Sequence, residues 1–151
     1  MASDAEVNAT LNDLIETCRD GQEGFRTAAE AVSDGELRRL FHEYSRQRAR
    51  FVGDLQDEVR RLGGDPENSG SIIASLHRGW MGLRAAVTGR DDRAILAECE
   101  RGEDSALSNY RTALGRDLPA SVRSLVERQF AEVKAAHDRV RSLQRASGAG
   151  A

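Results

Sequence analysis

The sequence predicts an all-α fold, an up-down bundle of four long helices with a short extra helix between its two halves. Of the 151 residues, 31% are charged, 39% are hydrophobic and 5% are aromatic, which suits amphipathic helices better than strands. Apolar residues also recur with helical spacing along most of the chain. Capping residues, glycines and prolines interrupt these stripes at the points where helices should begin and end.

The first half of the chain contains two long apolar stripes. Ser3 and Glu6 have the spacing of a capping box and begin a helix over about 4–32. Ser33 and Glu36 repeat that spacing and begin a second helix, which the Gly-Gly-Asp-Pro run at 63–66 ends. The short break between the two stripes predicts an antiparallel hairpin.

The second half begins with a shorter amphipathic segment, expected as a helix over 71–88. Asp91 and Asp92 can cap a fourth helix that ends near Gly115, and Pro119 begins a fifth. We expect a single domain over 1–146 and a flexible tail of small residues over 147–151.

A weak internal repeat predicts how the helices connect. A shift of 85 positions places residues 25–29 on 110–114, and the apolar stripe of 37–55 on that of 122–140. Two similar hairpins follow, joined by about 27 residues, long enough to cross the bundle as in ferritin-like folds. The alternative, that any two amphipathic hairpins share such similarity, stays open.

Four strings extend this prediction by resemblance: GFRTAAE at 24–30, RLGGDP at 61–66, LHRGW at 76–80 and CERGED at 99–104. They resemble a bacterial family of ferritin-like four-helix-bundle proteins of unknown function, and the resemblance runs from Leu11 to about Leu143. It implies the ferritin-like fold and an association with stress physiology, and it implies no mechanism.

A ferritin-like di-iron centre needs two single glutamates and two Glu-x-x-His pairs on inward faces, and the sequence contains no such pair. Glu103 lies seven residues before a tyrosine, a spacing similar to that between the single glutamate and an aromatic residue in ferritins. Under the internal repeat, the equivalent position in the first helix is Cys18. Gln47 and Glu132 occupy the paired-motif positions, followed three residues later by arginine and alanine. We therefore expect no metal and no cofactor. Iron or zinc bound by Glu103 and Glu132 is the alternative.

The three histidines, His42, His77 and His137, lie at the edges of apolar stripes, which is typical of half-solvated boundary residues. A zinc site built from Glu132 and His137 is disfavoured, because five residues along a helix turn the two side chains about 140° apart.

Polar residues near the middle of each long helix predict a hydrogen-bonded layer that fixes helix register. Its candidates are Gln22, Gln47, Glu103 and Gln129. A solvent-facing position for most of them and a ligand site stay open as alternatives. Trp80 is the candidate for a packed interface, against the bundle or a second subunit.

No nucleophile elbow, phosphate loop or catalytic triad pattern occurs, so no catalytic residue is expected. Interspersed charges, net −3, argue against nucleic acid as a partner. Two cysteines without a metal-binding pattern and the lack of a leader or membrane span favour a cytoplasmic protein with reduced thiols.

The leading prediction is a non-catalytic, stress-associated bundle that acts through protein contacts, as a homodimer. A metal-binding or metal-oxidising ferritin relative is the first alternative. A peripheral membrane binder is the second, because Trp80 and Met81 lie among arginines in the predicted third helix.

Overall fold

The computed structural model describes residues 2–66 and 79–149, and the regular secondary structure of these residues is entirely helical. Four long helices form a bundle: α1 (Asp4–Ala31), α2 (Gly35–Arg61), α4 (Asp92–Leu114) and α5 (Ala120–Ala149). A short helix, α3 (Leu83–Gly89), precedes α4. The predicted all-α bundle with an extra helix in its crossover is confirmed.

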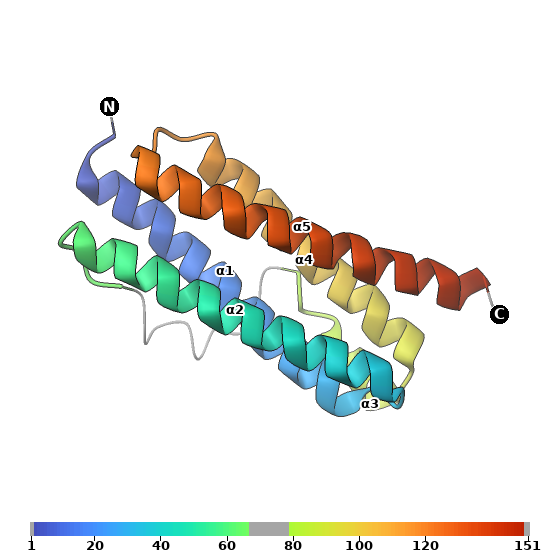
Figure 1. Cartoon of the computed structure of the whole chain (residues 1–151). Helices are drawn as coiled ribbons and strands as arrows, with labels where there is room; N and C mark the ends of the chain where they lie inside the picture. Colours follow the sequence, from blue (N-terminus) through green and yellow to red (C-terminus); the bar gives the residue numbers. More distant parts are fainter. Residues whose placement is uncertain (1, 67–78, 150–151) are drawn as a thin grey trace.

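The bundle consists of two antiparallel hairpins, α1 with α2 and α4 with α5 (Figure 1). The hairpins pack through α1 and α4, whereas α2 and α5 touch much less. Because α2 ends and α4 begins at opposite ends of the bundle, the connection between the hairpins is the long crossover.

The helix starts show one confirmed prediction and one error. Ser3 and Glu6 form the predicted capping box at the start of α1. The predicted box of Ser33 and Glu36 is wrong, because Asp34 caps α2 by accepting a hydrogen bond from the Leu37 amide at 2.9 Å. At the other end of α2, Gly63 has a φ of +77°, which favours glycine and ends the helix.

The third helix is shorter than predicted. It begins at Leu83, and residues 79–82 form a turn in front of it. The remainder of the predicted segment, 71–78, lies outside the described residues. Asp91 caps α4 as expected, and α5 continues to Ala149, beyond the predicted domain boundary at 146.

The core has two apolar clusters, one toward each end of the bundle. The cluster near the N-terminus contains Leu11, Leu14, Phe51, Leu55 and Val126 among its members. The other contains Phe25, Phe41, Trp80, Ile95 and Val140. Between them, all four long helices contribute polar side chains to the centre of the bundle.

Candidate functional site

A buried ion pair lies at the centre of the bundle. Arg48 of α2 and Glu103 of α4 are 1% and 0% exposed, and two Nη–Oε hydrogen bonds of 2.6 Å join them. The third guanidinium nitrogen, Nε, donates to Gln47 Oε1 at 3.1 Å. The Phe25 ring centroid lies 5.4 Å from Arg48 Cζ, so the guanidinium has partners along its edge and on its face.

The charge of this pair follows from its surroundings. Burial alone would lower the pKa of Arg48, but the negative charge of Glu103 and its hydrogen bonds outweigh burial and leave the pKa of Arg48 raised. The centre of the bundle therefore contains a positive charge that is matched by the carboxylate beside it.

A chain of hydrogen bonds links all four long helices beside the ion pair. The Tyr110 hydroxyl donates to Gln129 Oε1 at 2.7 Å, and Gln129 Nε2 donates to the Phe51 carbonyl at 3.4 Å. Because the hydroxyl proton of Tyr110 is committed to Gln129, the Cys18 thiol is the donor in its 3.1 Å contact with Tyr110. Each member of the chain thus has a defined direction.

The thiols and the phenol of this region are neutral at physiological pH. Burial raises the pKa of Cys18 from 9.0 to about 11, although the hydrogen bond to Tyr110 opposes that rise. Burial also raises the pKa of Tyr110 and of Cys99 well above their ordinary values. A nucleophilic cysteine requires a thiolate, so neither thiol is activated for catalysis.

The Trp80 side chain packs between α1 and α4. It is 2% exposed and packs edge-on against Phe25, with ring centroids 5.1 Å apart. A Cβ at Gly24 or Gly102 would overlap the Trp80 ring, so both glycines are needed for this close approach. The packed surroundings predicted for Trp80 therefore lie within the chain, and its position is in the turn before α3 rather than on a helix.

The structure places the four residues of the predicted polar layer differently: two lie at the centre, Gln47 lies at the edge, where it accepts a hydrogen bond from Arg48, and Gln22 contributes no side-chain hydrogen bond to the layer within the described part of the chain. Glu103 and Gln129 are buried and belong to the centre. Gln47 is half-buried at its edge, and Gln22, also half-buried, contributes its backbone carbonyl, which accepts a hydrogen bond from Ser45. Arg48 takes the central position predicted for Gln47.

The misplacement has a geometric signal in the sequence. On an ideal helix Arg48 lies about 40° from Tyr44, whereas Gln47 lies about 60° away on the other side. The buried residues Phe41 and Val59 lie on the side of Arg48. The stripe therefore favoured Arg48, and only the rarity of buried arginine argued against it.

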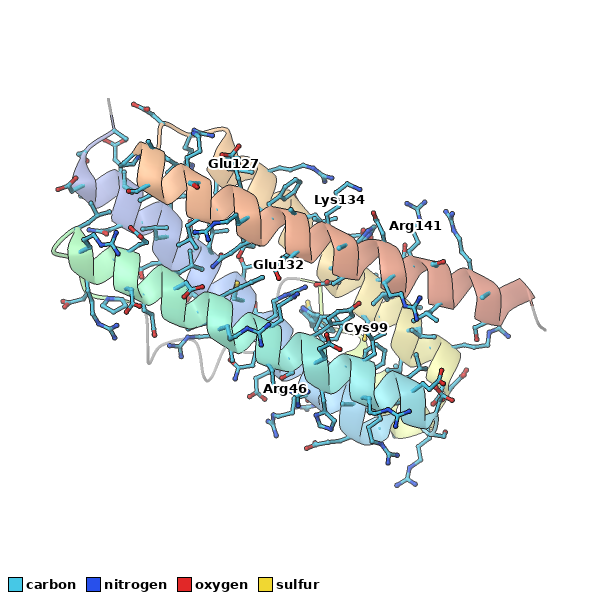
Figure 2. All side chains as sticks on the ribbon, in the orientation of Figure 1. Arg46, Cys99, Glu127, Glu132, Lys134 and Arg141 are labelled. Atoms are coloured by element: carbon cyan, nitrogen blue, oxygen red, sulfur yellow. The ribbon has the colours of Figure 1, made fainter. Side chains whose placement is uncertain are left out.

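The residues at the centre do not fit a ferritin-like di-iron centre. Under the repeat of 85, the corrected paired positions are Arg48 and Val133, and both are buried. The inward-facing set is thus Cys18, Arg48, Glu103 and Val133, which offers one carboxylate, already bound to a guanidinium. Glu132, the other predicted ligand, is exposed on α5 (Figure 2) and cannot join Glu103 in a core site.

The histidines are placed differently from one another. His42 is half-buried as predicted, and His77 lies outside the described residues. His137 is 6% exposed, so the boundary position predicted for it is wrong. Its imidazole lies between α4 and α5, with Nε2 2.6 Å from Asp104 Oδ1.

A model of the family described as "Domain of unknown function (DUF2383)" matches residues 6–116, which include most of α1, all of α2 and α4, and the crossover. The chain belongs to the DUF2383 family. No curated protein matches it.

Two solved structures share the fold of this DUF2383 protein at 15% identity. A mutant of Dps1 from Mycobacterium smegmatis superposes with a TM-score of 0.77, covering 93% of this chain and 96% of the Dps1 chain. A two-domain protein from Anabaena variabilis, with DJ-1/ThiJ/PfpI-like and ferritin-like domains, superposes with a TM-score of 0.79 over 99% of this chain and 39% of its own. These similarities confirm the ferritin-like fold.

None of the helices in the described part of this DUF2383 chain has the length and hydropathy that a membrane span requires. Because Trp80 is buried, it cannot belong to a lipid-facing surface together with the exposed Met81.

Proposed function

We propose that this chain is a non-catalytic, ferritin-like bundle protein of the cytoplasm that acts through protein contacts, chiefly with a second copy of itself. The observation that carries the proposal is the buried Arg48–Glu103 pair. Ferritin-like oxidases bind their metal ions through inward carboxylates at the bundle centre, and here a guanidinium neutralises the buried carboxylate. A metal ion there would displace Arg48 and leave its charge unpaired in the core.

The groups around the pair also favour a structural role. Cys18 and Tyr110 are neutral and hydrogen-bonded in a chain that ends on a backbone carbonyl. Every member has its partners within the protein, as expected for a network that fixes helix register.

A groove between α2 and α5 supports self-association. Leu37, Leu40 and Leu143 line it, and carboxylates of α2 and arginines of both helices surround these leucines. A face that carries both signs of charge beside apolar side chains is self-complementary under two-fold symmetry, because each glutamate can meet an arginine of the other copy. The proposed state is therefore a homodimer formed through this groove.

The stress association rests on the sequence resemblance alone. It is consistent with a protein whose role is binding rather than turnover, and it makes cells under stress the setting in which to look for a protein partner besides the second copy.

Iron oxidation tests the non-catalytic assignment. Protein treated with chelator is loaded anaerobically with Fe(II) and exposed to air while oxygen is recorded. We expect oxygen consumption equal to the buffer blank. Consumption above the blank that scales with protein concentration would overturn the proposal.

Sedimentation across a range of concentrations tests the dimer. We expect a monomer–dimer equilibrium that Leu40→Glu shifts toward monomer, because a carboxylate in the groove opposes an apolar contact. Ser108→Glu, an exposed position on α4, is the matched control and should leave the equilibrium unchanged. A monomer at all concentrations, or a dimer equally resistant to both changes, would refute the interface.

A further inference from the structure

Three potential metal ligands meet on the surface of the second hairpin, apart from the central ion pair. Glu100 and Asp104 of α4 and His137 of α5 each present a ligand atom, and these atoms all lie within 4.8 Å of one another. His137 is 6% exposed, whereas the Asp104 side chain is 60% exposed. The cluster therefore joins an anchored imidazole to carboxylates that solvent can reach.

Helix geometry explains why the ligands converge. Glu100 and Asp104 are four residues apart and lie on one face of α4. That face meets α5 at His137, whose Nε2 lies 2.6 Å from Asp104 Oδ1. The helix contact thus brings an imidazole and two carboxylates together before any ion binds.

A fourth residue sets the orientation of the imidazole. Asp138 Oδ1 lies 3.0 Å from His137 Nδ1, within hydrogen-bonding distance. In neutral imidazole only one nitrogen carries hydrogen, so a donor Nδ1–H leaves a lone pair on Nε2. Carboxylate–histidine pairs of this kind orient the histidine ligands of metal ions in proteins.

His137 Nε2 lies 2.6 Å from Asp104 Oδ1, so an imidazole nitrogen and an exposed carboxylate oxygen already lie side by side at the point where an ion would bind. An imidazole with two carboxylates suits Zn²⁺, which takes nitrogen and oxygen ligands at about 2.0–2.2 Å.

We propose that Glu100, Asp104 and His137 bind one divalent ion, Zn²⁺ or a similar borderline metal, with Asp138 as the positioning residue. In tetrahedral coordination the ligand atoms lie about 3.3 Å apart. The Asp104 carboxylate must therefore move slightly away from His137 Nε2, and its exposure to solvent leaves room for that movement. Water completes the coordination. A bound ion would link α4 to α5. The site goes beyond the proposed function, because it lies outside the core and does not involve the Arg48–Glu103 pair.

Two neighbouring cations compete with the metal ion. Arg141 Nε lies 3.7 Å from Glu100 Oε2, and Lys134 Nζ lies 3.0 Å from Asp138 Oδ2. Both side chains are about half exposed, and Figure 2 shows them on the opposite side of the α5 ribbon from Glu132. They can therefore swing into solvent when the ion binds.

Calorimetric titration of Zn²⁺ into chelator-treated full-length protein tests the site, with Co²⁺ absorption as a second readout of coordination. We expect one Zn²⁺ per chain, with affinity lowered at least tenfold by Asp104→Asn and by His137→Gln. Asp138→Asn should weaken binding about tenfold, the lower end of the effect of such positioning residues. Glu132→Gln, an exposed carboxylate of the same helix outside the cluster, is the matched control and should bind as the native chain does.

Circular dichroism of each metal-free variant separates loss of ligand from loss of fold. Absence of Zn²⁺ binding by the folded native chain would overturn the proposal, as would equal binding by Asp104→Asn and Glu132→Gln. Nitrogen-15 spectra that show both ring N–H groups of His137 at pH 7 with Zn²⁺ present would also overturn it. Oxygen consumption with Fe(II) tests the proposed function separately, because Zn²⁺ binding at this site requires no oxygen consumption.

Discussion

Arg48 and Glu103 are two side chains that the core tolerates only together. Arg48→Met leaves Glu103 as an unpaired buried carboxylate and should lower the free energy of unfolding by about 3–5 kcal/mol. The double variant Arg48→Met/Glu103→Leu removes both charges, so its free energy of unfolding should fall much less. Urea unfolding of the single and the double variant measures the two changes. The matched control is Asp57→Asn, which breaks the exposed Arg60–Asp57 pair and should change little.

Losses that simply add in the double variant would contradict this account. They would show that each side chain contributes by its own packing rather than by the pair, since independent residues give additive changes in stability.

The buried thiols and phenol predict a loss of stability in alkali. The pKa of Cys18 is about 11 in the folded protein against 9.0 for an ordinary thiol. The stabilisation of the folded state by the neutral thiol is therefore complete below pH 9 and is lost as the pH rises toward 11. A pKa difference of about two between the folded and the unfolded state corresponds to roughly 3 kcal/mol in the free energy of unfolding. Tyr110 and Cys99, with raised pKa values, act in the same direction.

Urea unfolding at a series of pH values from 7 to 11 measures this effect. The Cys18→Val variant should show a shallower decline, because one titrating group is gone. A free energy of unfolding that stays level to pH 11 in the native chain would contradict the prediction.

Single residues also show where sequence reasoning succeeds and where it stops. Glu103 and Gln129 were predictable as central polar residues, because their phase matches the apolar stripe. Arg48 has the right phase too, but a charge is expected inside only with a partner, and its partner is 55 positions away on another helix. The cluster of Glu100, Asp104 and His137 was out of reach for the same reason, since it depends on how α4 and α5 face each other.

At the scale of the elements, the contact of Trp80 with α1 and α4 controls how closely those helices approach. Gly102→Ala should lower the free energy of unfolding by about 1–3 kcal/mol, because its methyl group has no room beside the ring. In a Trp80→Ala background the same substitution should cost less, since the ring is absent. Thermal or urea unfolding of the native chain, the two single variants and the double variant completes this cycle.

Gly53→Ala is the control for that cycle. Gly53 lies within α2, and a Cβ there would have no atom within 4 Å. Alanine should therefore stabilise the helix by about 0.5–1 kcal/mol. A Gly102→Ala effect of the same sign and size would refute the close-packing explanation.

Helix ends were predictable where the cap is local and not where it depends on tertiary contacts. The capping box of Ser3 and Glu6 lies within four residues of sequence and has the predicted form. Ser33 looked equally suitable for α2, but its hydroxyl and amide bind Asp92 instead. Likewise, Trp80 has the helical phase of its neighbours, yet its burial between α1 and α4 accompanies a turn.

At the scale of the whole molecule, the internal repeat predicts the topology correctly and the site register nearly so. It pairs Cys18 with Glu103, and both are buried at the centre. On the other two helices the buried equivalents are Arg48 and Val133, one position after the pair chosen from the sequence. Apolar periodicity defines a helix face to within about one residue, since each step is about 100°. That tolerance is enough for a fold and too coarse for a ligand set.

The bond between Asp92 and the turn before α2 has a consequence for how the molecule opens. The Asp92 carboxylate accepts hydrogen bonds from the amides of Ser33 and Asp34, at 2.9 and 3.1 Å, which joins the start of α4 to the turn between α1 and α2. These two amide protons lie in an exposed turn, yet they should exchange slowly with deuterium, at a rate set by separation of the two hairpins. Asp92→Ala should release them to rapid exchange, while Glu36→Gln, which changes a nearby carboxylate, should not. If both amides exchange rapidly in the native chain, the two hairpins part far more often than this contact implies.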